Sequence, residues 1–212
     1  MDRSRGYNRS ARKLLHIVAG LLAFTLPFIP YWLALLAAIA GTTASYILKP
    51  THAWWLRYIS KPVDRHRGVI TGLRGYATVV LLLILAWPLL SLLREDAVRY
   101  VMFGWLALAL CDGSAGLIGP GPAEARTVFW NRHKTWWGLL GGFVGASVAY
   151  LLSFLWPPSM LADLSIVGVL GLAFGIGTVT ALLESLQTPV DDNYLVGIGA
   201  PLLALLCNSF VN

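Results

Sequence analysis

The sequence predicts an all-α protein that crosses a membrane about seven times and folds as one helical bundle. Hydrophobic residues make up 57% of the 212 residues, and charged residues only 12%. The apolar residues fall into seven runs, each close to the ~20 residues that a membrane-spanning helix needs. No polar stretch between these runs is long enough for a separate soluble domain. Residues 1–212 are therefore expected to form a single integral-membrane domain.

The seven apolar runs place the expected helices along the chain. Their approximate bounds are 14–29, 31–48, 68–93, 97–119, 136–155, 164–183 and 194–211. The first two runs are short and meet around Pro30, which predicts a tight helical hairpin. Residues 50–67, which include Trp54 and Trp55, are too polar to span a membrane. They form either a helix lying in the membrane interface or a basic loop with a belt of Trp residues.

Basic residues predict the orientation. With the amino terminus in the cytoplasm and the carboxy terminus outside, the cytoplasmic side collects 13 of the 16 Lys and Arg residues, as the positive-inside rule requires. The far side receives Arg94 and Arg99, and Arg74 lies just inside the third helix. The cytoplasmic segments are then the basic tail 1–13 and the loops 49–67, 120–135 and 184–193. Such a protein would lie in an inner or plasma membrane with its functional face toward the cytoplasm.

The net charge and the amino-terminal segment have ordinary explanations. Orientation and anionic lipid headgroups account for the formal charge of +6, and no motif indicates nucleic-acid binding. The basic tail and first apolar run imitate a signal peptide, but no small-residue cleavage site precedes the second run. The first helix is therefore expected to be retained.

Cysteines and small residues indicate packing. Cys111 and Cys207 are expected at opposite membrane faces as small buried residues, too far apart for a disulfide. Small residues four positions apart let helices approach closely in a membrane. Such residues occur in the fifth and sixth runs, as Gly138, Gly142 and Ala146, as Gly141, Gly145 and Ala149, and as Gly171 and Gly175. They pack helices within one chain or between chains, so a homodimer is one open alternative.

The most informative residues are the charged ones at the edges of apolar runs, all on the expected cytoplasmic side. They are Asp112, Lys134, Glu184, Asp191 and Asp192. An ionisable group near hydrocarbon is costly, so each is a functional candidate.

The fourth run ends in CDGSAGLIG, with Asp112, Gly116 and Gly119 on one helical face. Nothing bulky on that face blocks a ligand from the carboxylate. Gly113, Ser114, Gly116 and Gly119 could unwind the helix end and expose backbone N–H groups to phosphate. The alternative is an Asp112 side chain paired with a structural Arg.

The loop before the fifth run ends in NRHKTWWG. Arg132, His133 and Lys134 precede the helix, and Thr135 is a plausible N-cap. A helix amino terminus next to basic side chains suits phosphate groups. The alternative is the ordinary basic flank of a membrane helix.

The segment ALLESLQTPVDDN joins the last two runs. Glu184 closes the sixth, and Asp191, Asp192 and Asn193 open the seventh. Together with Asp112 these carboxylates could hold Mg²⁺, which prefers oxygen ligands. The alternative is that the Asp and Asn residues cap the helix and that Glu184 lies in solvent.

In the first run, ARKLLHIVAG places Arg12, Lys13 and His16 on one helical face. His16 is either a hydrogen-bonded structural residue or a group that orients or deprotonates a lipid hydroxyl.

These elements, in this order, resemble the polyprenol kinase family, which includes dolichol, phytol and farnesol kinases and a CTP-dependent diacylglycerol kinase. The matching stretches are RKLLHIVAG, CDGSAGLIG, KTWWG and ALLESLQTPVDDN, and the last looks closest to the phytol-kinase-like branch. The resemblance implies a multi-pass enzyme that transfers the terminal phosphate of a nucleotide, typically CTP, to a lipid alcohol with Mg²⁺ or Mn²⁺. The family motifs correspond to three groups in this chain, Asp112–Gly113, Lys134–Thr135 and Asp191–Asp192–Asn193.

Two stretches depart from the family pattern. Cys111 stands where relatives often have Gly, and the loop after Gly119 reads PGPAEARTVFW instead of a more basic, Gly-containing segment. Because that loop is expected to touch the nucleotide, the choice between CTP and ATP stays open.

The resulting hypothesis assigns a role to each residue. Lys134, Arg132 and the start of the fifth helix, with His133, Thr135 and Asn193 nearby, hold the nucleotide phosphates. Asp112, Asp191 and Asp192 hold the metal. Glu184 or Asp112 accepts the proton of the lipid hydroxyl, with His16 as the third candidate, and Arg12, Lys13 and His16 face the lipid.

Two other functions stay open. A nucleotidyltransferase that makes a CDP-lipid would need the same metal and phosphate site, plus cations for a lipid phosphate, which Arg12, Lys13 and Arg74 could supply. A small transporter is the third alternative, although the two halves of the chain show no inverted repeat.

Overall fold

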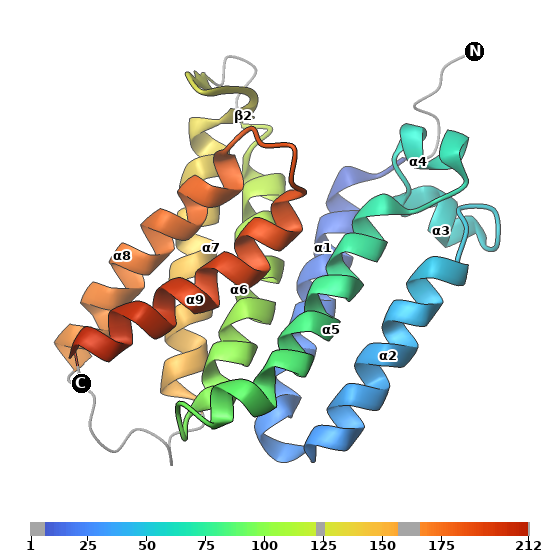
Figure 1. Ribbon diagram of the computed structural model, residues 1–212. Coiled ribbons are helices and arrows are strands. Elements are labelled where there is room, and N and C mark those ends of the chain that lie inside the picture. Colours follow the sequence, from blue (N-terminus) through green and yellow to red (C-terminus); the bar gives the residue numbers. More distant parts are fainter. Residues whose placement is uncertain (1–6, 122–125, 157–165, 212) are drawn as a thin grey trace.

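The computed structural model describes residues 7–121, 126–156 and 166–211, which form a helical bundle with one small β-hairpin (Figure 1). The helices are α1 Arg9–Leu21, the 3₁₀ helix η1 Leu22–Phe28, α2 Tyr31–Ile47, α3 Trp54–Ile59, α4 Pro62–Arg67, α5 Thr71–Ser91, α6 Ala97–Ile118, α7 Trp136–Leu155, α8 Ile166–Ser185 and α9 Asp192–Val211. The strands β1 Thr127–Val128 and β2 Asn131–Thr135 pair antiparallel.

Five helical segments among the described residues are long and apolar enough to cross a membrane. They are Arg9–Phe28, Thr71–Ser91, Ala97–Ile118, Trp136–Leu155 and Ile166–Ser185. The all-α class is confirmed, and the length and composition of these helices suggest a membrane protein. Seven crossings stay a prediction, because α2 is a shorter apolar helix and α9 is not among these five segments. The cytoplasmic amino terminus also stays a prediction.

The expected hairpin between the first two runs is wrong. α1 packs along α6, whereas α2 packs along α5, and Figure 1 shows α5 between α1 and α2. The connection explains the separation: η1 contains Pro27, and the extended backbone at Pro30 carries the chain away before α2 begins. The two helices therefore diverge and leave space between them.

α6 is the centre of the bundle and contacts α1, α5, α7 and α9. Its contact with α7 depends on glycine, since a Cβ on Gly141 would lie 2.9 Å from the Ser114 carbonyl oxygen, and one on Gly145 would collide with the Leu110 carbonyl. Gly171 and Gly175 do not pack against another helix of the described chain, since a Cβ on either residue would meet nothing within 4 Å there. Packing of these two glycines between chains stays a prediction.

The two cysteines are free, Cys111 buried and Cys207 partly buried. The segment 50–67 contains two short helices, α3 and α4, and α4 ends at Gly68, whose φ of 64° suits glycine.

The β-hairpin occupies the described part of the predicted loop 120–135. Trp130 Nε1 donates to Ser185 Oγ at 2.9 Å, and Asn131 Nδ2 donates to the Ser185 carbonyl oxygen at 3.0 Å. These bonds attach the hairpin to the end of α8. Figure 1 shows the hairpin, the α8–α9 connection, α3 and α4 at the same end of the bundle.

Candidate functional site

Asp112 lies on α6, about two turns before the helix ends, and its partners come from α1. Lys13 Nζ donates to both carboxylate oxygens at 2.6 Å, and His16 Nε2 is 3.5 Å from Oδ2. Asp112 is therefore paired with Lys13, and not with the structural Arg that the alternative interpretation expected. Gly116 makes this pairing possible, because a Cβ there would come within 3.0 Å of Lys13 Cγ.

Lys134 joins the hairpin to the last two helices. Its Nζ donates to Glu184 Oε1 at the end of α8, and to Asp192 Oδ2 at the start of α9 at 3.4 Å. The Glu184 side chain is only 3% exposed, so its charge depends on this cation. Burial alone would lower the pKa of Lys134, but the Glu184 carboxylate raises it above its ordinary value, and the side chain stays cationic.

Three carboxylates from three helices form a candidate metal site. One oxygen each of Asp112, Glu184 and Asp192 lies within 4.8 Å of the other two. Mg²⁺ binds oxygen at ~2.1 Å, so neighbouring ligands of one octahedral ion are ~3.0 Å apart and opposite ligands ~4.2 Å apart. The three oxygens would have to move closer together to bind one ion, and the donor set fits Mg²⁺.

Asp191, expected to bind metal, lies outside this cluster. Its Oδ1 accepts from the Asn193 backbone N–H at 2.9 Å and from Asn193 Nδ2 at 2.7 Å. Both side chains face Gly75 of α5, where a Cβ would be 3.0 Å from Asn193 Nδ2. Asp191 therefore caps α9, which was the alternative interpretation, and Asn193 is buried beside it. Glu184 completes the three-carboxylate cluster.

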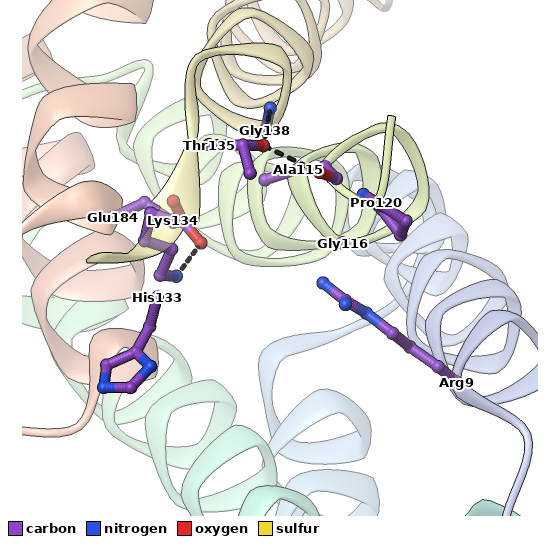
Figure 2. Close-up of a pocket in the computed structure, with 10 residues that line it drawn as sticks. Arg9, Ala115, Gly116, Pro120, His133, Lys134, Thr135, Gly138 and Glu184 are labelled. Carbon is purple, nitrogen blue, oxygen red and sulfur yellow. Dashed lines mark hydrogen bonds and ion pairs between the residues drawn. The ribbon is translucent and has the colours of Figure 1, made fainter. Parts of the chain in front are cut away.

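A cavity of about 330 Å³ opens beside the carboxylates (Figure 2). Gly116 and Gly119 of α6 line one side, and the hairpin residues His133, Lys134 and Thr135 line the other. Figure 2 shows Arg9 reaching from α1 toward the glycine-rich end of α6. From the sequence, Arg9 was expected only to belong to the basic tail 1–13. Its position four residues before Lys13, on the same helical face, could have identified it.

The other predicted phosphate-binding residues lie elsewhere. Gly113 packs on α1, since a Cβ there would lie 2.5 Å from Ile17 Cγ1. Ser114 packs toward Gly145 of α7. Arg132 is exposed and is not among the residues that line the cavity.

The expected unwinding of α6 is also wrong. The helix is regular to Ile118, and Gly119 keeps a right-handed helical conformation with φ of −57°. Some backbone N–H groups at the amino terminus of α7 already have hydrogen-bond partners. Thr135 is the N-cap, as predicted, and its Oγ1 accepts from Gly138 N–H at 3.0 Å. Trp136 N–H donates to the Arg126 carbonyl oxygen. Phosphate binding here would thus depend on cationic side chains more than on free backbone N–H groups.

The lipid-side residues predicted on α1 divide between two environments. Lys13 points to Asp112, whereas Arg12 and His16 line a second, smaller cavity of about 70 Å³ with Tyr76 of α5. Arg74, a candidate for binding a lipid phosphate, is already engaged: its Nη2 donates to the Tyr46 carbonyl oxygen at 3.0 Å.

His16, which lines the smaller cavity, is held by three neighbours. Its ring meets the Tyr76 ring edge-on with centroids 4.2 Å apart. Nε2 lies 3.2 Å from the Leu108 carbonyl oxygen and 3.5 Å from the Asp112 carboxylate. Both neighbours are acceptors, which favours the tautomer that carries its proton on Nε2 and leaves Nδ1 basic.

No protein-family model, curated protein or solved structure matches this chain.

Proposed function

We propose that this protein is a membrane-embedded lipid-alcohol kinase. It transfers the terminal phosphate of CTP, or of another nucleoside triphosphate, to an isoprenoid alcohol at the cytoplasmic face of the membrane. The observation that carries the proposal is the meeting of two ion-pair clusters, Lys13–Asp112 and Lys134–Glu184–Asp192, beside a cavity that Lys134 and Glu184 line, at one end of a bundle of membrane-length helices. The resemblance of the sequence motifs to polyprenol kinases supports the choice of donor and acceptor.

The nucleotide would occupy the larger cavity. Its phosphates would be compensated by Arg9 and Lys134, with Lys13 at the edge beside Gly116. Asp112, Glu184 and Asp192 would hold Mg²⁺ or Mn²⁺. A bound divalent ion would neutralise charge on the phosphates, while the protein's own contribution is position and electrostatics.

The acceptor hydroxyl would come from the side of the smaller cavity. Its oxygen bonds to the terminal phosphorus, the bond from that phosphorus to the bridging oxygen breaks, and the nucleoside diphosphate leaves. The hydroxyl proton passes to His16, which lines this cavity, and Asp112 at 3.5 Å stabilises the resulting imidazolium. We favour His16 over Glu184 and Asp112 because both carboxylates belong to the candidate metal cluster.

One observation favours a second candidate, a nucleotidyltransferase that forms a CDP-lipid. Arg12 Nη1 is buried and has no hydrogen-bond partner within the described residues. A lipid phosphate in the smaller cavity would satisfy it. In that reaction the lipid phosphate attacks the α-phosphorus of CTP and pyrophosphate leaves.

The decisive experiment uses purified protein in detergent with Mg²⁺ and γ-labelled CTP or ATP. The acceptors are farnesol, geranylgeraniol, phytol, a long polyprenol and diacylglycerol. A kinase moves label into one alcohol, and Lys134→Ala abolishes the transfer. Arg126→Ala is the matched control, because Arg126 is an exposed basic residue immediately before the hairpin and outside the cavity lining.

The other outcomes separate the candidates. Pyrophosphate released only when a lipid phosphate is supplied would establish the nucleotidyltransferase. Neither product, from protein shown to be folded, would refute both enzymatic proposals.

A further inference from the structure

The space between the diverging helices α1 and α2 is a third cavity, of about 370 Å³. It is bounded by α1 and η1, by α2 and by α5. Apart from Thr25, Thr42, Tyr76 and Trp105, its lining is aliphatic or glycine. The hydroxyls of Thr25 and Thr42 donate to backbone carbonyls, and Trp105 Nε1 donates to the Tyr76 hydroxyl. These polar groups are thus already satisfied, and the cavity suits hydrocarbon.

One end of this cavity is lined by Leu26, Ala34 and Ile84, which are buried. Leu22, Thr25, Ala37 and Gly41 also line the cavity but are exposed, so it is open along one side. The buried end is therefore where a long occupant would meet protein side chains.

The other end adjoins the small cavity that Arg12 and His16 line. The two cavities share three lining residues, Ala19, Leu73 and Tyr76. An occupant of the apolar cavity would therefore place its head beside His16, which is 3.5 Å from Asp112. Arg12 Nη1, buried and unpartnered among the described residues, faces the same region and needs an oxygen atom as partner.

The dimensions limit the occupant to one chain. Leu73 and Ile84 line opposite ends on α5, so at ~1.5 Å per residue the cavity extends about 16 Å. An extended chain advances ~1.2 Å per bond, which corresponds to about a dozen carbons.

We propose that this cavity binds the single hydrocarbon chain of a lipid alcohol about as long as farnesol, with its hydroxyl at His16 and Arg12. The inference rests on the proposed kinase function for the identity of the head group. Diacylglycerol would leave one of its two chains outside the cavity, and a long polyprenol would extend past the end lined by Leu26, Ala34 and Ile84.

The test shortens the cavity at its buried end. Ala34→Phe places a ring beside Leu26 and Ile84, and Ala40→Phe, on an exposed position of α2 outside the lining, is the matched control. With labelled nucleotide, Ala34→Phe should reduce transfer to farnesol about tenfold or more and leave the shorter geraniol near the wild-type rate. Ala40→Phe should leave both rates unchanged. Equal loss on both alcohols, or no loss on farnesol, would overturn the inference.

A second readout needs no turnover. Farnesol with a photoreactive diazirine at its chain end, in the absence of nucleotide, should label the peptide that contains η1 and α2. Labelling there without any phosphoryl transfer would support the cavity assignment and refute the kinase. Phosphoryl transfer with labelling elsewhere would keep the kinase and refute the cavity assignment.

Discussion

Replacing Lys134 with Met tests both the fold and the chemistry of the candidate site. Met removes the ammonium group but keeps much of the aliphatic length. Its loss leaves the Glu184 carboxylate, 3% exposed, without its cation. Breaking a buried ion pair typically costs 3–5 kcal/mol. Lys134 is itself 27% exposed and Asp192 remains nearby, so we expect a loss of about 2 kcal/mol in the free energy of unfolding.

The same change should reduce phosphoryl transfer more than stability alone explains. Removing one well-placed charge-stabilising group costs ~10²–10³ in rate. Adding Glu184→Gln to Lys134→Met removes the unpaired buried carboxylate, so the double variant should regain most of the lost stability. It should not regain activity, because the cation and one candidate metal ligand are both absent.

The assay combines unfolding of the purified protein in detergent with the labelled-nucleotide assay, and Arg126→Met serves as the control for the hairpin. Lys134→Met with the activity and the stability of the control would refute the reasoning. Full recovery of activity in the double variant would show that the Lys134–Glu184 pair has only a structural role.

Three further predictions follow from the geometry. Asp192→Asn should raise the Mg²⁺ concentration required for half-maximal rate about tenfold, and Asp191→Asn should change it far less. A Mg²⁺ titration of each variant would measure both effects. A similar shift for both would restore Asp191 to the metal site. His16→Gln should reduce kcat by ~10²-fold or more with little change in KM for the nucleotide, and an unchanged kcat in steady-state kinetics would exclude His16 as the proton acceptor. Gly145→Val should destabilise the protein by about 1–3 kcal/mol, because the new side chain would collide with the α6 backbone. Gly171→Val, whose side chain would meet open space, should leave thermal unfolding unchanged. Equal effects of the two variants would contradict the packing of α7 on α6.

The helices could be predicted because their signals are local. A run of apolar residues from 97 to 119 corresponds to α6, which ends at Ile118, and the run 136–155 matches α7. Thr135 was identified as an N-cap from its place before that run, and its hydroxyl does accept the Gly138 N–H. Hydrophobic length and capping depend on neighbours along the chain, so neither needs tertiary information.

The contacts between helices were predicted less well. Because successive membrane helices run in opposite directions, the sequence correctly predicted one end of the bundle for Asp112, Lys134, Glu184 and Asp192. Periodicity within each helix, however, does not determine which side chains meet. A Cβ at Gly116 would obstruct Lys13, which shows that the small residue serves the Lys13–Asp112 pair as well as access to the cavity. Gly171 and Gly175 have the same spacing as the packed glycines of α7 and contact nothing in the described chain.

The sequence by itself determined the all-α class, the bounds of most helices and the residue types that gather at one end, because hydrophobic run length and the cost of burying charge are properties of a segment. Only the tertiary structure decided that Asp192, and not Asp191, joins the carboxylate cluster. Adjacent residues at a helix start point in different directions, and the one that caps α9 cannot also face α6. Tertiary packing likewise decided that α2 follows α5 instead of α1, because α1 is already committed to the glycine face of α6. That choice opened the apolar cavity beside His16.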